Sequence, residues 1–122
     1  MTVPRPSILI ADDDPRVRQL LKNCLADLDA RCIECAGGME AVAAYSLYEP
    51  DWALMDLQMQ GLDGISATRQ IIETFPKARV LIVTQFEGPQ LRQAAREAGA
   101  CGYVLKDNLL GVREFMIGTA EQ

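Results

Sequence analysis

Residues 7–15 read SILIADDDP, which combines an apolar run, an acidic turn and a helix start in one continuous stretch. The run 7–11 has the length and composition of a strand that is covered on both faces. Asp14 is suited to be a helix N-cap, and Pro15 suits the first helical position. A strand that leads directly into a helix is the repeating unit of α/β folds. This stretch therefore predicts the fold class.

The helix that follows is predicted from residue 15 to about residue 28, because apolar residues recur there at the spacing of one helix face. These positions are Val17, Leu20, Leu21, Cys24, Leu25 and Leu28.

The strand–helix alternation continues to the end of the chain. Further strands are predicted at about 31–36, 52–55, 80–83 and 101–105, and further helices at about 39–48, 65–75, 89–98 and 109–120. The helix at 89–98 would face inward with Leu91, Ala94, Ala95 and Ala98, and the last helix has Leu109, Val112, Met116 and Thr119 at helical spacing. Five such units imply a doubly wound parallel sheet with helices on both faces. We expect residues 1–122 to form one domain, without an output domain in the chain.

The composition and net charge of the chain exclude several classes of function. The chain has 122 residues, a net charge of −5 and no histidine. The acidic balance argues against direct nucleic-acid binding. The absence of histidine excludes a histidine-dependent triad, a histidine-ligated zinc and a phosphohistidine carried by the chain itself. No apolar stretch reaches the length of a membrane span and the start is no signal peptide, so a cytoplasmic protein without a membrane partner is expected.

Cys32 and Cys35 have the spacing of a redox or zinc pair. Both fall in the predicted strand 31–36, where residues three apart point to opposite faces. We therefore expect them to be ordinary buried or half-buried cysteines.

Four predicted strands end on polar residues that suit metal or phosphate chemistry. Asp12 and Asp13 follow the first strand, Asp56 the third, Thr84 the fourth and Lys106 the fifth. The carboxyl ends of neighbouring parallel strands lie at one edge of the sheet, where α/β folds place ligands. Three acids suit a hard divalent cation such as Mg²⁺, and a lysine and a threonine suit a phosphoryl group. The pattern predicts a site where an aspartate is phosphorylated.

Each residue can be given a role. Asp56 would be the nucleophile that forms an acyl phosphate. Asp13 and Asp56 would be direct ligands of Mg²⁺, Asp12 would act through water, and the backbone carbonyl of Gln58 would fill another position. The alternatives are that the acids only cap the first helix and that Asp56 only caps the next turn; Asp14 alone suffices for the first of these.

Five segments together resemble the receiver domain of two-component response regulators, over essentially the whole chain. They read ILIADDDP (8–15), LMDLQM (54–59), LDG (62–64), VLIVT (80–84) and GYVLKD (102–107). The resemblance implies a flavodoxin-like (βα)5 fold, Asp56 as phosphoacceptor, Asp12 and Asp13 for magnesium, and Thr84 and Lys106 as switch residues. It also places Tyr103 at the aromatic switch position; an ordinary half-buried edge tyrosine is the alternative.

The resemblance also implies partners. A histidine kinase or phosphotransfer protein would donate the phosphoryl group, and a surface of the fourth helix, fifth strand and fifth helix would switch. The protein would be a signalling switch that catalyses only its own phosphoryl transfer and dephosphorylation. The segment 102–107 is most similar to receivers that carry a helix-turn-helix DNA-binding domain. The output is therefore a downstream protein, or an appended DNA-binding domain if the chain is a fragment, with a phosphorylation-linked homodimer as a further expectation.

Two departures from the family pattern bear on function. Met59-Gln60 stands where the family usually has Met-Pro, which predicts a less rigid loop. Gln58 and Phe86 occupy the positions that tune dephosphorylation, and an apolar Phe86 predicts a long-lived phosphoryl group. Among other classes, a dehalogenase-type phosphatase would need an acid at Gln58. A receiver-like binding module that is never phosphorylated is the remaining alternative.

Overall fold

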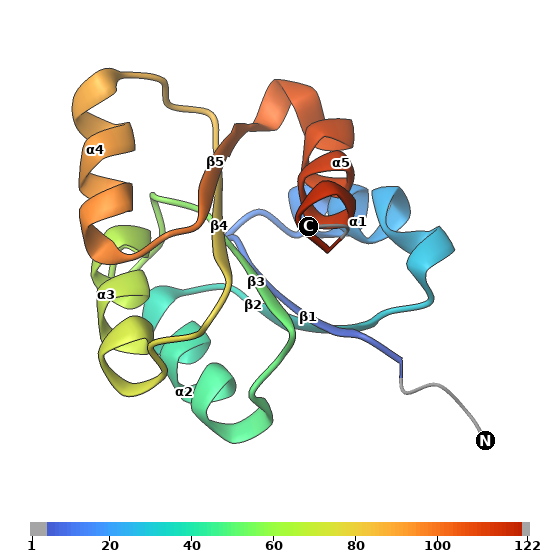
Figure 1. The fold of residues 1–122 in the computed structure, drawn as a ribbon, viewed down its shortest axis with the longest axis horizontal. Helices are drawn as coiled ribbons and strands as arrows, with labels where there is room; N and C mark the ends of the chain where they lie inside the picture. Colours follow the sequence, from blue (N-terminus) through green and yellow to red (C-terminus); the bar gives the residue numbers. More distant parts are fainter. Residues whose placement is uncertain (1–4, 121–122) are drawn as a thin grey trace.

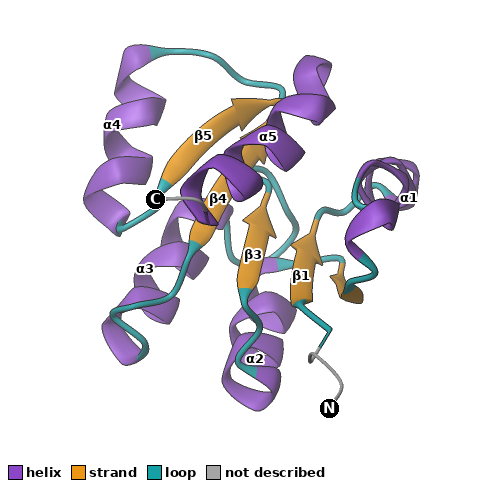
Figure 2. Ribbon diagram, turned by 45° about the vertical axis from the view of Figure 1, so that its right-hand side comes forward, coloured by secondary structure: helices purple, strands orange, loops and turns teal. Residues whose placement is uncertain are grey.

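A computed structural model describes residues 5–120 of the chain. Within these residues, a five-stranded parallel sheet has the order β2-β1-β3-β4-β5. The strands are β1 (Ser7–Ala11), β2 (Arg31–Cys35), β3 (Trp52–Met55), β4 (Val80–Thr84) and β5 (Gly102–Leu105). The α-helices are α1 (Pro15–Cys24), α2 (Gly38–Tyr48), α3 (Gly64–Thr74), α4 (Pro89–Ala98) and α5 (Leu109–Ala120). The predicted flavodoxin-like (βα)5 fold is confirmed (Figure 2).

Helices cover both faces of the sheet. Figure 1 shows α2, α3 and α4 on one side and α1 and α5 on the other. The first side packs around Leu9, Met55 and Ile82, and the second around Ile8, Leu54 and Leu81. Because the residues of the three central strands meet a helix layer on one side or the other, β1, β3 and β4 read as continuous apolar runs.

The register brings the carboxyl ends of the strands together. Ala11 pairs with Met55 across β1 and β3, so Asp12 and Asp56 leave neighbouring strands at the same level. Thr84 pairs with Leu105, the residue before Lys106. The predicted gathering of strand ends at one edge of the sheet is therefore present.

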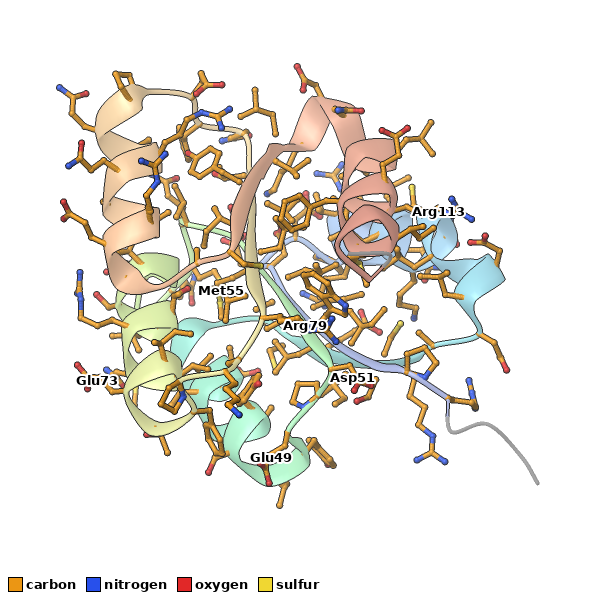
Figure 3. All side chains as sticks on the ribbon, in the orientation of Figure 1. Glu49, Asp51, Met55, Glu73, Arg79 and Arg113 are labelled. Carbon is orange, nitrogen blue, oxygen red and sulfur yellow. The ribbon has the colours of Figure 1, made fainter. Side chains whose placement is uncertain are left out.

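The opposite edge of the sheet is closed by structural contacts. The Nε of Arg79 donates to the backbone carbonyl of Asp51 at 3.2 Å, and the guanidinium lies 4.5 Å from the ring centroid of Trp52. Figure 3 labels Arg79 and Asp51 side by side at this end of β3, with Met55 farther along the strand.

The first helix differs from the prediction. The α-helix ends at Cys24, and a short 3₁₀ turn (Ala26–Leu28) replaces the last predicted turn. Tightening of this kind is common at helix ends, and it lets the chain reverse into β2 at Arg31. Leu25 and Leu28 still pack against the core on the α1 side. The prediction of one continuous helix to residue 28 was wrong.

Two leucines that we expected to face inward are exposed, Leu20 by 51% and Leu91 by 36%. The side of α1 that meets β1 carries Leu21 instead, which is 2% exposed. Helix α4 lies beside β5, the last strand of the sheet, so its outer flank has no neighbouring layer to cover Leu91. A helix at the rim buries a narrower stripe than its apolar pattern predicts.

The other predicted boundaries agree with the structure to within one residue. Cys32 packs on the α1 side and Cys35 on the α2 side of the sheet, as expected for residues three apart in a strand. Burial raises the pKa of the Cys35 thiol to about 11, which makes it unreactive. The side chain of Thr119 lies outside the described residues. In the part of the chain that the structure describes, none of the helices has the length and apolarity to cross a bilayer.

Candidate functional site

Three carboxylates meet at the carboxyl edge of the sheet. Asp12 and Asp13 follow β1 and Asp56 follows β3, and one oxygen of each lies within 4.8 Å of the others. Asp12 and Asp56 are 2% and 4% exposed, whereas Asp13 is open to solvent. Carboxylates this close repel one another, and burial of two of them strengthens the repulsion.

Lys106 reaches this cluster from the start of a 3₁₀ turn (Lys106–Asn108) directly after β5. Its Nζ lies 2.8 Å from Oδ2 of Asp12 and 3.1 Å from Oδ2 of Asp56. Within residues 5–120, this ammonium group thus pairs with two of the three carboxylates, and the cluster keeps an excess of negative charge.

The remaining oxygens of the buried pair are held by the backbone. Oδ1 of Asp12 accepts a hydrogen bond from the amide of Asp14 at 2.8 Å, and Oδ1 of Asp56 accepts one from the amide of Leu57 at 2.8 Å. Arg18 in α1 donates to the backbone carbonyl of Asp12 at 2.6 Å. As predicted, Asp14 also caps α1, because its side chain accepts from the amide of Arg16. The carboxylates are therefore fixed in place before any ligand binds.

The electrostatics agree with an under-neutralised cluster. Burial, followed by the charge of Asp12, raises the pKa of Asp56 above its usual value, and Lys106 offsets this only in part. For Lys106, burial alone would lower the pKa, but hydrogen bonds and charges from Asp12 and Asp56 reverse this and raise it. Additional positive charge at this edge would stabilise the ionised form of Asp56.

The two other predicted switch residues contact the backbone of one residue, Phe86, in the β4–α4 loop. Thr84 is fully buried, and its Oγ1 accepts a hydrogen bond from the amide of Phe86 at 3.3 Å. The hydroxyl of Tyr103 donates to the carbonyl of Phe86 at 2.7 Å. Because Thr84 uses a lone pair here, its own proton remains free to donate to a phosphoryl oxygen.

The loop after Asp56 depends on glycines whose role the sequence interpretation missed. A Cβ on Gly64 would lie 1.9 Å from the carbonyl oxygen of Asp56, and one on Gly38 would lie 2.0 Å from that of Leu62. The close approach of α3 to the end of β3 thus requires glycine at position 64. Asp63 caps α3 through the amide of Ser66 at 2.9 Å. The pair Asp63-Gly64 before an apolar run was the signal in the sequence.

The predicted site residues divide into three groups. Asp12, Asp13, Asp56 and Lys106 form one cluster. Thr84 and Tyr103 meet through Phe86. Gln58 is exposed in the loop directly after Asp56. The carboxylate set fits a hard divalent cation, because its oxygens converge and lack enough counter-charge.

Comparison with known proteins gives the family. The profile of the response regulator receiver domain matches residues 8–111. The chain is 37% identical over 102 residues to the uncharacterized transcriptional regulatory protein YhcZ of Bacillus subtilis, covering 82% of this chain and 48% of YhcZ. It is 35% identical to the chemotaxis protein CheY of Halobacterium salinarum, covering 81% of this chain and 82% of that protein.

A solved structure agrees with these relatives. The crystal structure of a LuxR-family two-component response regulator from Aurantimonas has a TM-score of 0.83 and 32% identity, covering 95% of this chain and 87% of that one. The chain spans about half the length of the transcriptional regulators it matches. The fold, the cluster of strand ends and these matches together lead to one conclusion: the chain belongs to the response regulator receiver domain family of two-component signalling.

Proposed function

We propose that Asp56 accepts a phosphoryl group from a phosphohistidine of a histidine kinase or phosphotransfer protein, and that residues 1–122 act as one receiver domain. One observation carries the proposal. The carboxylates of Asp12, Asp13 and Asp56 converge, and the ammonium group of Lys106 pairs only with the buried two, which leaves a site with excess negative charge beside a potential nucleophile. Such a site suits the joint binding of a divalent cation and a phosphoryl group.

The side chains of Asp12, Asp13 and Asp56 would hold Mg²⁺, with the backbone carbonyl of Gln58 as a further ligand. When bound, Mg²⁺ neutralises charge on the transferring phosphoryl oxygens. The convergence of the three carboxylates within 4.8 Å supports this assignment.

The chain's own residues would divide the reaction between them. A carboxylate oxygen of Asp56 attacks phosphorus, a new O–P bond forms, and the N–P bond of the donor breaks with its electron pair returning to the imidazole. Lys106 pairs with the phosphoryl oxygens in exchange for part of its contact with Asp12. Thr84 donates its hydroxyl proton to another of these oxygens. Burial of Asp56 and Thr84 keeps bulk water from the new bond.

The output would follow from the added charge. A phosphorylated Asp56 brings close to two negative charges to this edge of the sheet. Thr84 and Lys106 move to meet them, and Tyr103 transmits the shift to the surface of α4, β5 and α5. A downstream protein, an attached DNA-binding domain or a second copy of the receiver would read that surface. Match to transcriptional regulators supports the DNA-binding output.

The test is the intact mass of the protein after incubation with acetyl phosphate, with and without Mg²⁺. We expect one Mg²⁺-dependent phosphoryl adduct on the wild type and none on Asp56→Asn. Asp107→Asn, which changes an exposed carboxylate beside Lys106, is the matched control and should keep the adduct. A folded wild type without an adduct would overturn the proposal in favour of a receiver-like binding module that works without phosphorylation.

A further inference from the structure

Arg92 on α4 connects the two parts of the predicted switch. Its guanidinium pairs with both carboxylate oxygens of Glu87, at 2.6 and 2.8 Å, and also lies 4.6 Å from the ring centroid of Tyr103. Glu87 follows Phe86, whose carbonyl accepts the hydrogen bond of the Tyr103 hydroxyl. The contacts therefore form a closed ring from Tyr103 through Phe86, Glu87 and Arg92 back to Tyr103. We call these four residues the latch.

The latch is connected to the acceptor site by one further hydrogen bond. The amide of Phe86 donates to Oγ1 of Thr84, so Thr84 is bonded to the backbone of a residue that belongs to the latch. Movement of the β4–α4 loop would shift Thr84 and Tyr103 together. Arg92 touches the loop through Glu87 and the ring of Tyr103 directly, so it is the residue that closes the ring of contacts.

Chemistry favours arginine in this place. A guanidinium can bind a carboxylate with two parallel hydrogen bonds and stack on an aromatic face at the same time, whereas an ammonium group cannot do both. The side chain is not buried under other elements. It lies between two surface grooves of about 270 and 550 Å³, both of which also include Tyr103. The latch is thus exposed to solvent and to any partner that binds this face.

We propose that Arg92 is a positioning residue that locks the β4–α4 loop and Tyr103 in the arrangement seen here and so prepares Thr84 to receive the phosphoryl group on Asp56. The second part rests on the proposed function, because it requires that Asp56 accepts phosphate. The first part is a property of the unmodified protein and can be measured without phosphorylation.

The first measurement is hydrogen exchange of the amides of Phe86 and Gly88, which are bonded to Thr84 and to Glu87 respectively. In Arg92→Leu we expect both to exchange about fivefold faster, because an ion pair and a cation–π contact are lost together. Arg96→Leu is the matched control: Arg96 lies one turn farther along α4 beside the same groove, and its side chain has no ion pair or hydrogen bond among residues 5–118. Equal exchange rates in Arg92→Leu and wild type would overturn the proposal that Arg92 locks the β4–α4 loop.

Two further variants separate the contributions of Arg92. Arg92→Lys keeps the charge but loses the bidentate and stacked geometry, so it should restore only a small part of the protection. The double variant Glu87→Arg, Arg92→Glu exchanges the two charges. It restores an ion pair but leaves no cation over the ring of Tyr103, so the amide of Phe86 should still exchange fast. Full protection in either variant would overturn the role of stacking on Tyr103.

The second measurement is the rate of adduct formation with acetyl phosphate and Mg²⁺. We expect Arg92→Leu to be phosphorylated about fivefold more slowly and Arg96→Leu at the wild-type rate. A loosened loop with an unchanged rate would overturn the link to Asp56 while leaving the latch intact. A wild type that takes no phosphoryl group would instead overturn the proposed function, and with it this link, whatever the exchange rates.

Discussion

We call Asp12, Asp13, Asp56 and Lys106 the acceptor cluster, after the role proposed for Asp56. The acceptor cluster and the latch are both charged, yet they are built in opposite ways. In the acceptor cluster, the side chains of Asp12 and Lys106 are 2% and 18% exposed, and acids outnumber the cation. In the latch, the side chains of Arg92 and Glu87 are 42% and 51% exposed, and the charges balance one to one.

This difference suits the two regions to different tasks: the first can bind a cation, and the second can bias the position of a loop. A buried excess of like charge is costly, and binding of a cation relieves it. An exposed, balanced pair is weak and screened by salt, so it can bias a loop without holding it permanently. We expect substitutions in the first region to have large effects and those in the second to have small, specific ones.

The largest expected difference between the two regions is the loss of stability when a glycine is replaced by alanine. Gly64→Ala should lower the free energy of unfolding by about 3 kcal/mol or more, because its Cβ would lie 1.9 Å from the Asp56 carbonyl oxygen. Gly88→Ala, at the latch, should change it by no more than about 0.5 kcal/mol, since a Cβ there meets nothing within 4 Å. Urea unfolding of both variants measures this. Similar values would mean that the acceptor loop is not closely packed.

The second largest effect should come from removal of the ammonium group that pairs with the two buried carboxylates. Lys106→Met leaves the carboxylates of Asp12 and Asp56 without their shared partner, so the free energy of unfolding without Mg²⁺ should fall by about 2 kcal/mol. Added Mg²⁺ should raise the Tm of this variant more than that of the wild type, because binding stabilises the folded state. Lys77→Met, at an exposed position, should behave as wild type. An equal Mg²⁺ response in both would argue against a shared site.

The lifetime of a phosphoryl group on Asp56 should depend on Phe86, which is a residue of the latch. Phe86 lies in the latch, and its apolar ring is unsuited to orient a hydrolytic water. Phe86→Glu should therefore lose the phosphoryl group several-fold faster than wild type, because a carboxylate can position and deprotonate water. Loss of adduct mass over time measures this, with Gln90→Glu on α4 as a control for added charge. A slower Phe86→Glu variant would count against it.

Salt should produce the smallest effect and distinguish the two kinds of charge contact. Raising NaCl from about 0.05 to about 0.5 M should speed exchange of the Phe86 amide about twofold in wild type, because it screens the exposed pair of Glu87 and Arg92. Arg92→Leu should not respond. The amide of Leu57, which is bonded to buried Asp56, should also be insensitive to salt. Equal responses at Phe86 and Leu57 would mean that salt screens the charges of the two regions to the same extent.

Much of the fold followed from local patterns. Apolar runs of strand length, the Asp14-Pro15 helix start and five regular alternations predict a parallel sheet, because burial on both faces demands uninterrupted apolar strands. The exposure of Leu20 and Leu91 did not follow. Helical spacing identifies an apolar face, but how much of that face is covered depends on which elements lie beyond it.

The sequence by itself determined which chemical groups gather at the site. Asp12, Asp13, Asp56 and Lys106 each follow a strand, and Thr84 is the last residue of one. Parallel strands end at one edge, so the presence of these residues at that edge is a consequence of order along the chain. Only the tertiary structure decided how they pair. Lys106 contacts Asp12 and Asp56 from far along the chain, and Arg92 joins Glu87 to Tyr103. Such contacts depend on the relative placement of packed helices and loops, which no local spacing records.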